Sequence, residues 1–123
     1  MADSHIQEPF GTIAASGDKL TVTPPHGILS RRDYVFDRNR QTVTVADKKF
    51  FIMGSSKSHT FEHLSFRVSL YGTNADQCVE MECRIPGKPL IVYRLTDTTP
   101  DKDKMASVKQ AITDATGIDR WSG

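Results

Sequence analysis

The sequence has little of what marks a secreted, membrane-spanning or nucleic-acid-binding protein. Its longest apolar runs, residues 50–53 and 90–93, are far shorter than the ~20 residues that cross a bilayer. The first thirty residues contain no apolar stretch long enough for a signal peptide. Sixteen Lys and Arg face fifteen Asp and Glu, so the net charge of +1 lacks the excess of a nucleic-acid binder. We therefore expect a cytoplasmic protein that does not bind nucleic acid.

Cysteine is also scarce: Cys78 and Cys83 are the only two. They lie in the alternating segment 77–85, where residues an odd number apart point to opposite faces, so they cannot bond to each other within a regular strand. Cys83 shares its face with apolar residues and is expected to be a core thiol. Cys78 shares its face with Glu80 and Glu82 and is expected to be an exposed or edge thiol. Because no Cys-x-x-Cys or Cys/His quartet is present, we expect neither structural zinc nor another cofactor.

Length and composition predict one folded domain. The chain has 123 residues, of which 37% are hydrophobic and 25% charged, an ordinary balance for a protein with one hydrophobic core. We expect this domain to span residues 10–118. Residues 1–9 are polar and are expected to form a flexible N-terminal arm, and residues 119–123 a C-terminal tail.

Most of the chain alternates polar and apolar residues, the pattern of β-strands. The clearest example is residues 63–71, whose even-numbered members are all apolar from 64 to 70. Residues 54–58 are small and polar, which is typical of a loop. The pattern predicts seven strands, at residues 19–23, 33–37, 41–46, 49–53, 63–71, 77–85 and 90–95.

The period changes to that of a helix over residues 100–116. An apolar stripe recurs there at steps of three and four residues. The stripe consists of Met105, Val108, Ile112 and Ala115. Thr99 is the expected N-cap and Gly117 the residue that ends the helix. Trp121 follows and is expected to fold back on the sheet.

Seven strands followed by one helix resemble the layout of the pleckstrin-homology-like (PH-like) barrel. Residues 34–38, Tyr-Val-Phe-Asp-Arg, lead into the alternating residues 41–45, and Phe-Glu-His-Leu-Ser follows at 61–65. This order is similar to that of small bacterial PH-like domains of unknown function. The resemblance covers residues 10–118 and implies a mainly β fold: a seven-stranded antiparallel barrel or sandwich capped by one C-terminal α-helix.

The resemblance also implies a place for a binding site. In many PH domains the loop after the first strand and the adjacent strand bind inositol phosphates, and residues 24–32 correspond to that loop. Residues 31–49 hold six Lys and Arg against three Asp. The candidate anion-binding residues are Arg31, Arg32, Arg38 and Arg40, because guanidinium forms paired hydrogen bonds with phosphate. A strand of about 17 Å separates the two pairs, so one small phosphate group cannot engage all four.

A second motif, His59-Thr-Phe-Glu-His63, matches the H-x-x-E-H pattern of zinc proteases. That chemistry needs both histidines on one helical face, with the glutamate as base. Here His63 begins the clearest strand, and at strand rise the two histidines lie about 13 Å apart. We therefore expect neither a metal nor catalysis at this motif. The paired carboxylates Glu80 and Glu82 are expected to be neutralised by neighbouring arginines.

Together these observations favour a non-catalytic PH-like module that docks to a protein or peptide partner, at an open sheet edge or beside the helix. An alternative is a peripheral module that uses the four arginines on an anionic lipid surface and binds it weakly. A second alternative is a small enzyme, which requires a deep pocket with clustered titratable groups.

Overall fold

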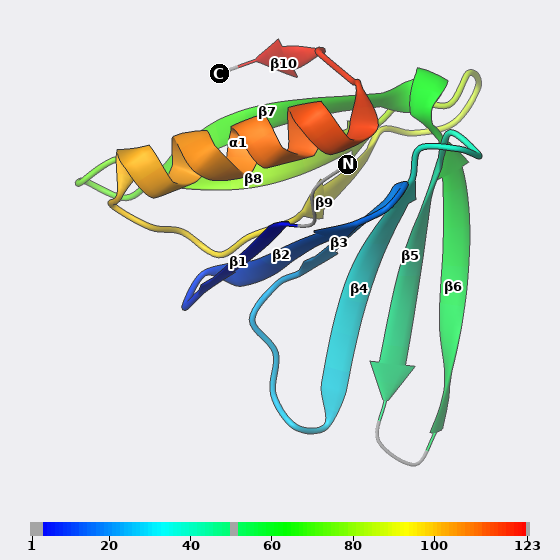
Figure 1. Cartoon of the computed structure of the whole chain (residues 1–123), viewed down its shortest axis with the longest axis horizontal. Coiled ribbons are helices and arrows are strands. Elements are labelled where there is room, and N and C mark those ends of the chain that lie inside the picture. Colours follow the sequence, from blue (N-terminus) through cyan, green and yellow to red (C-terminus); the bar gives the residue numbers. More distant parts are fainter. Residues whose placement is uncertain (1–3, 50–51, 123) are drawn as a thin grey trace.

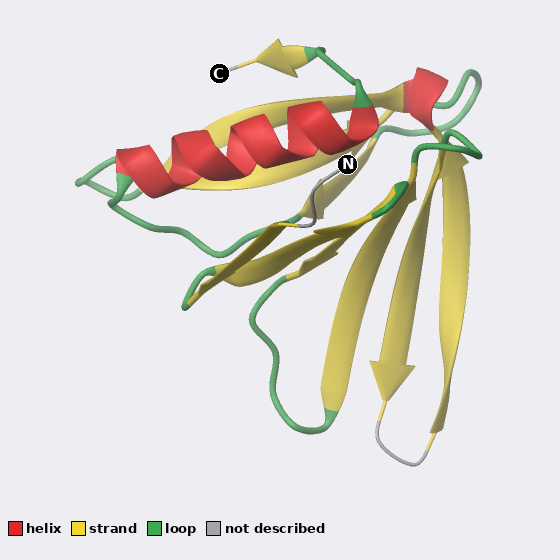
Figure 2. Cartoon of the chain, in the orientation of Figure 1, coloured by secondary structure: helices red, strands yellow, loops and turns green. Residues whose placement is uncertain are grey.

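The computed structural model describes residues 4–49 and 52–122, which form two sheets and one long helix (Figures 1 and 2). The first sheet contains, in spatial order, β1 (Ser4–Glu8), β2 (Gly11–Ser16), β3 (Lys19–Thr23), β4 (Ser30–Asp37), β5 (Thr42–Lys49) and β6 (Ile52–Thr60). The second contains, in spatial order, β10 (Trp121–Ser122), β7 (Leu64–Tyr71), β8 (Asp76–Cys83) and β9 (Ile91–Arg94). A 3-10 turn, η1 (Phe61–His63), joins the sheets, and helix α1 (Lys102–Thr116) follows β9.

The fold is mainly β with one C-terminal helix, as predicted, but it is not a seven-stranded barrel. The described residues form ten strands in two open sheets. All strand pairs are antiparallel except β10 with β7, which is parallel. The additional strands are β1, β2 and β10, in which the sequence shows no regular alternation of polar and apolar residues.

The core lies between the two sheets and beneath α1. The ring of Phe36 from the first sheet lies 6.0 Å from that of Phe66 in the second, measured between centroids. The helix packs on β8 and on the β2–β4 part of the first sheet. Three members of the predicted stripe, Met105, Val108 and Ile112, are fully buried as expected. The fourth buried helical residue is Thr116.

The helix begins two residues later than predicted, at Lys102 instead of Pro100. Asp101 is the N-cap, since its carboxylate accepts a hydrogen bond from the Lys104 N–H at 3.0 Å. Thr99 instead accepts from the Asp101 N–H at 3.2 Å, so it orders the residue before the helix. Gly117 ends the helix as predicted, because its left-handed φ of 74° lets its N–H reach the Thr113 carbonyl.

Three segments expected to be irregular are strands. Residues 4–8 form the edge strand β1 instead of a loose arm, and Trp121–Ser122 of the expected tail pair with β7. Residues 54–58 form the middle of β6 instead of a loop. Backbone hydrogen bonds to one neighbouring strand are enough to hold an edge strand. Such a strand does not need an apolar face, so its sequence need not alternate between polar and apolar residues.

The strand expected at 49–53 is also wrong in its bounds. Lys49 ends β5 and Ile52 begins β6, and the two residues pair with each other. Phe50 and Phe51 lie outside the described residues. Asp47 and Lys48, where the sequence suggests a turn, therefore lie within β5.

Both cysteines are free and buried, so the expectation of an exposed or edge Cys78 is wrong. The strand β8 lies between β7 and β9, and Glu80, which shares the face of Cys78, is buried as well. The expected neutralising arginines are present: Arg67 lies 2.9 Å from Glu80, and Arg84 lies 3.8 Å from Glu82. No helix in the described part of the chain combines the length and apolarity needed to cross a membrane.

Candidate functional site: a basic tip on the β4–β6 strands

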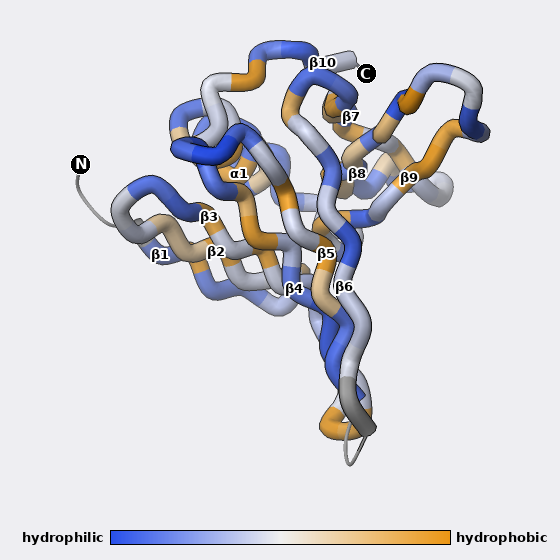
Figure 3. Tube along the Cα trace, turned by 90° about the vertical axis from the view of Figure 1, so that its right-hand side faces the viewer, coloured by the Kyte–Doolittle hydropathy of each residue, from blue (hydrophilic) through white to orange (hydrophobic). Residues whose placement is uncertain are grey.

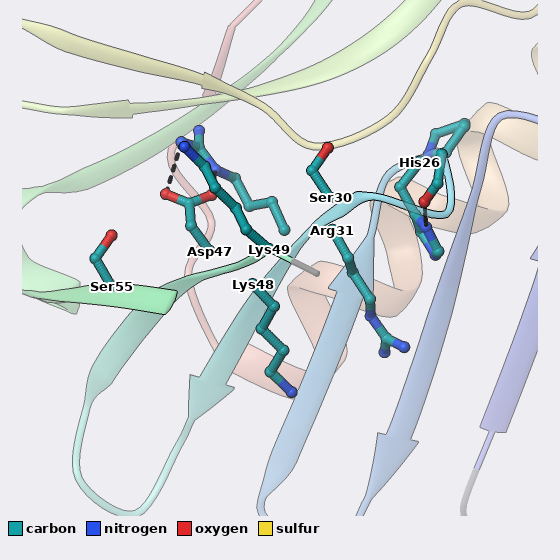
Figure 4. Close-up of a pocket in the computed structure, with 10 residues that line it drawn as sticks. His26, Ser30, Arg31, Asp47, Lys48, Lys49 and Ser55 are labelled. Carbon is teal, nitrogen blue, oxygen red and sulfur yellow. Dashed lines mark hydrogen bonds and ion pairs between the residues drawn. The ribbon is translucent and has the colours of Figure 1, made fainter. Parts of the chain in front are cut away.

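Strands β4, β5 and β6 extend beyond the core and end far from the helix, at the bottom of Figure 1. Seen from the side in Figure 3, they narrow to a tip. The loop between β3 and β4, the start of β4 and the end of β5 meet there. We call this region the basic tip and define it by Ile28, Leu29, Arg31, Arg32, Lys48 and Lys49. A hollow of about 560 Å³ opens at it, lined by the loop and both strands (Figure 4).

Strand register places the cations of the basic tip on both faces of the sheet. Arg31 pairs with Lys48, whereas Arg32 pairs with Asp47 on the next rung. Residues directly opposite each other share a face and successive residues alternate. Figure 4 shows Arg31 and Lys48 pointing to one side and Lys49 to the other. A small anion bound on one face therefore cannot contact all the cations of the tip.

On one face, Arg32 forms a paired salt bridge with Asp47. Its guanidinium donates at 2.6 and 3.0 Å to the two carboxylate oxygens, which holds the pKa of Asp47 below its ordinary value. The same guanidinium lies 5.9 Å from the centre of the Tyr93 ring. Arg32 is therefore positioned by groups already present, with its outer surface still exposed.

On the other face, Arg31 and Lys48 surround the buried Asp33. The Asp33 carboxylate accepts from Thr23 at 2.7 Å and from Arg31 at 2.9 Å, and Lys48 lies 3.9 Å away. Burial raises the pKa of Asp33, but the hydrogen bonds from Thr23 and Arg31 outweigh it and the pKa is lowered. The basic tip thus sets four cations against two ionised carboxylates, Asp33 and Asp47.

The loop of the basic tip exposes two adjacent aliphatic side chains. Ile28 is 94% exposed and Leu29 is 65% exposed. With Arg31, Lys48 and Lys49 they line a second hollow of about 340 Å³. Isolated exposed aliphatic residues are common, whereas an exposed aliphatic pair that lines one hollow with three cations is a combination suited to a membrane interface.

Ile28 and Leu29 were missed as site residues by the analysis of the sequence. The signal was available: Pro24, Pro25 and Gly27 predict a loop, and two aliphatic residues follow at once without an alternating pattern.

The structure separates the four candidate arginines. Arg31 and Arg32 lie at the basic tip, and Arg38 and Arg40 lie beyond the other end of β4, as expected from the strand length. Arg38 donates to the Asp114 carbonyl in the last turn of α1 at 3.1 Å, and Arg40 lies 3.9 Å from Asp37. Arg38 therefore stabilises the contact between helix and sheet, away from the tip.

The two histidines of the H-x-x-E-H motif have separate structural partners. His59, at the end of β6, is buried and shares a 2.8 Å hydrogen bond with the Tyr93 hydroxyl. Burial lowers the pKa of His59, which favours the neutral ring. His63 lies in η1, one residue before the strand it was expected to begin, and bonds to the Thr60 hydroxyl. Among the described residues, no cluster of three or more His, Cys, Asp or Glu is arranged to hold a metal.

Comparisons of the chain with family models, curated proteins and solved structures gave no match. The function of the basic tip must therefore be argued from its own chemistry.

Proposed function

We propose that the chain is a non-catalytic module that binds an anionic membrane surface through its basic tip. The observation that carries this proposal is the pair of exposed aliphatic side chains, Ile28 and Leu29, which line one hollow with Arg31, Lys48 and Lys49. Transfer of aliphatic groups from water to the boundary of the acyl chains lowers the free energy, and Lys and Arg are attracted to anionic headgroups. Both contributions act at one place and favour the same partner.

The geometry supports a surface over a soluble phosphate compound. Arg31 and Arg32 point to opposite faces of the sheet, so a small ligand on one face leaves the other arginine unused. A flat anionic surface that meets the tip end-on approaches both faces at once. The loop residues then lie nearest the bilayer, and the cations around them lie at the level of the headgroups.

The expected affinity is modest. Each cation near an anionic surface contributes about 1 kcal/mol. Arg31 and Arg32 are paired with carboxylates, so roughly half of the contribution of the four cations is offset, which leaves about 2 kcal/mol. Transfer of Ile28 and Leu29 from water contributes about 1.5–3 kcal/mol each if burial is complete. The total, about 5–8 kcal/mol, corresponds to a dissociation constant between about 200 μM and 1 μM. Binding should weaken as salt rises, because the charged part is screened.

A second candidate function is docking of an extended peptide at the outer edge of β6. The observation that favours it is the length of that edge: β6 spans nine residues, and residues 54–58 are all exposed. Within the described residues, no strand lies on its outer side. An open edge of this length can accept a further strand through main-chain hydrogen bonds.

Cosedimentation with vesicles tests the membrane proposal. Phosphatidylcholine vesicles with and without phosphatidylserine are compared at low and physiological salt. Lys48→Ala with Lys49→Ala should weaken binding by roughly tenfold to hundredfold. Lys88→Ala with Lys102→Ala removes the same charge from exposed positions outside the basic tip and serves as the control.

Equal losses in both double variants would show that net charge, and not the basic tip, drives binding. Equal binding to neutral and anionic vesicles would contradict the electrostatic part of the proposal. Absence of binding to any vesicle would favour peptide docking at β6.

A further inference from the structure

We infer that protonation of His26 strengthens the attachment of the basic tip to an anionic membrane, so that binding depends on pH. This inference rests on the membrane proposal above and adds the regulation of the same site. Histidine is the side chain whose charge ordinarily changes between about pH 5 and pH 8. A histidine at the contact surface is therefore one more cation in mildly acidic solution and a neutral group in mildly alkaline solution.

His26 lies in the loop of the basic tip, close to the exposed aliphatic pair. Its side chain is exposed, and it lines both hollows of the tip. In the larger hollow it lies with the four cations of the tip, and in the smaller one with Ile28 and Leu29. His26 therefore belongs to the surface that would meet the headgroups.

A hydrogen bond fixes where the His26 ring takes up its proton. Nδ1 lies 2.8 Å from the Gly27 carbonyl oxygen (Figure 4). A carbonyl oxygen only accepts, so Nδ1 carries the hydrogen and donates it. Nε2 is then the basic nitrogen, and its protonation keeps the bond to Gly27, because the charged ring donates from both nitrogens. The loop can therefore gain a charge without losing its own hydrogen bond.

The charges that face His26 oppose its protonation in the free protein. Five charged residues line the larger hollow with it: Arg31 and Arg32 from β4, and Asp47, Lys48 and Lys49 from β5. The strand β6 contributes an uncharged residue, Ser55. The paired salt bridge with Arg32 holds Asp47 in its ionised form. Four cations against one carboxylate leave an excess of three positive charges, and like charges disfavour a further one.

Contact with an anionic membrane reverses this balance. The headgroups bring negative charge to the cations of the tip, and a surface potential of about −30 mV concentrates protons about threefold at the membrane. Both effects favour the protonated ring in the bound state over the free state. By linkage, a protein that takes up a proton when it binds must bind more tightly as the pH falls.

The other histidines lie away from this contact. His5 lies in β1, at the edge of the first sheet opposite to β6, and His63 lies in η1 between the sheets. His59 is buried, and burial lowers its pKa, which favours the neutral ring. A pH dependence of membrane binding can therefore be assigned to His26, and His5 and His63 supply the control.

Vesicle binding at about pH 7.5 and about pH 5.5 tests this inference, since histidine changes its charge between these values. The vesicles contain phosphatidylcholine and phosphatidylglycerol, whose phosphodiester stays ionised throughout, so the lipid charge is constant. Ionic strength is kept the same. The wild-type chain should bind about fivefold more tightly at the lower pH, the gain expected from one further cation at an anionic surface.

Two variants separate the charge of His26 from its place in the loop. His26→Gln stays neutral and His26→Lys stays charged, so neither should show the pH dependence. The lysine variant should bind more tightly than the glutamine variant at both pH values. The control, His5→Gln with His63→Gln, should keep the dependence of the wild type.

The outcomes distinguish the regulation from the membrane proposal itself. Equal affinity of the wild type at both pH values, or a pH dependence that persists in His26→Gln, would overturn the role of His26 and leave the membrane proposal standing. Absence of binding to anionic vesicles at either pH would overturn both.

Discussion

Glu80 holds together the outer face of the β7–β8–β9 sheet, and removal of its charge is expected to destabilise the protein in a pH-dependent way. One carboxylate oxygen accepts from Arg67 at 2.9 Å and from Ser69 at 2.5 Å, and the other accepts from Tyr71 at 2.8 Å. Glu80 is only 5% exposed. Burial raises its pKa, but the three donors outweigh burial, so the pKa lies below its ordinary value of 4.5.

A lowered carboxyl pKa stabilises the folded state above the unfolded pKa, and this stabilisation is lost as the pH falls through the folded pKa. Glu80→Gln keeps one acceptor oxygen and the shape of the side chain but removes the charge. Hydrogen bonds to charged groups contribute about 1.5–3 kcal/mol, against about 0.5–1.5 kcal/mol for neutral ones. Because the Arg67 side chain is 39% exposed, water offsets part of the loss, and we expect about 2 kcal/mol.

Urea unfolding at about pH 7 and about pH 3 measures this effect. The free energy of unfolding should fall in the variant at the higher pH, and the difference from wild type should shrink at the lower pH. Glu62→Gln is the matched control, because that carboxylate is exposed and its nearest ion-pair partner, His63, lies 3.8 Å away. A loss of the same size at both pH values, or none at neutral pH, would refute the proposed role of the charge.

Further expected outcomes concern the core, the tip and the histidines. Ile112→Asp buries an unpaired carboxylate where the native side chain is fully buried, which costs several kcal/mol and should unfold the domain; wild-type-like melting would show that α1 is not part of the core. Gly54→Ala should lower amide protection in β5 and β6, because an added Cβ overlaps the Asp47 carbonyl, whereas Gly27→Ala meets no neighbour; equal protection in both would argue against the close approach. Metal analysis of the purified chain should find no stoichiometric zinc, and zinc lost on His63→Ala would restore the H-x-x-E-H interpretation.

The pattern of polar and apolar residues predicted the helix and the strands that bury one face and expose the other. The alternation of β7 and the three-and-four spacing of α1 each place one apolar face on the core, so the positions of Phe66 and Ile112 could be inferred from spacing alone. The role of Gly117 could be predicted as well, since the left-handed conformation at the end of a helix favours glycine.

The edge strands could not be predicted from the sequence, because backbone pairing with one neighbouring strand holds them. The strand β6 is polar at residues 54–58 and extends beyond the core, so no apolar face distinguishes it from a loop. Cys78 and Glu80 are buried by side chains from the neighbouring strands β7 and β9. The spacing of residues within β8 carries no information about these neighbours.

The candidate site was partly predictable. Local charge identified Arg31 and Arg32, and strand length separated them correctly from Arg38 and Arg40. What charge alone did not show was that Arg38 caps α1, or that Ile28 and Leu29 lie exposed next to the cations. Both facts depend on which segments the fold brings to one place.

Insertion of the loop into lipid is the most direct test of the membrane proposal. Ile28→Cys is labelled with a polarity-sensitive dye, and Asn74→Cys in the exposed β7–β8 turn is the control; both native cysteines are buried. On vesicles containing phosphatidylserine, the dye at position 28 should shift its emission to shorter wavelength, the dye at position 74 should not, and added salt should reverse the shift. A dye at position 28 that keeps its aqueous emission while the protein cosediments with the vesicles would contradict the proposal.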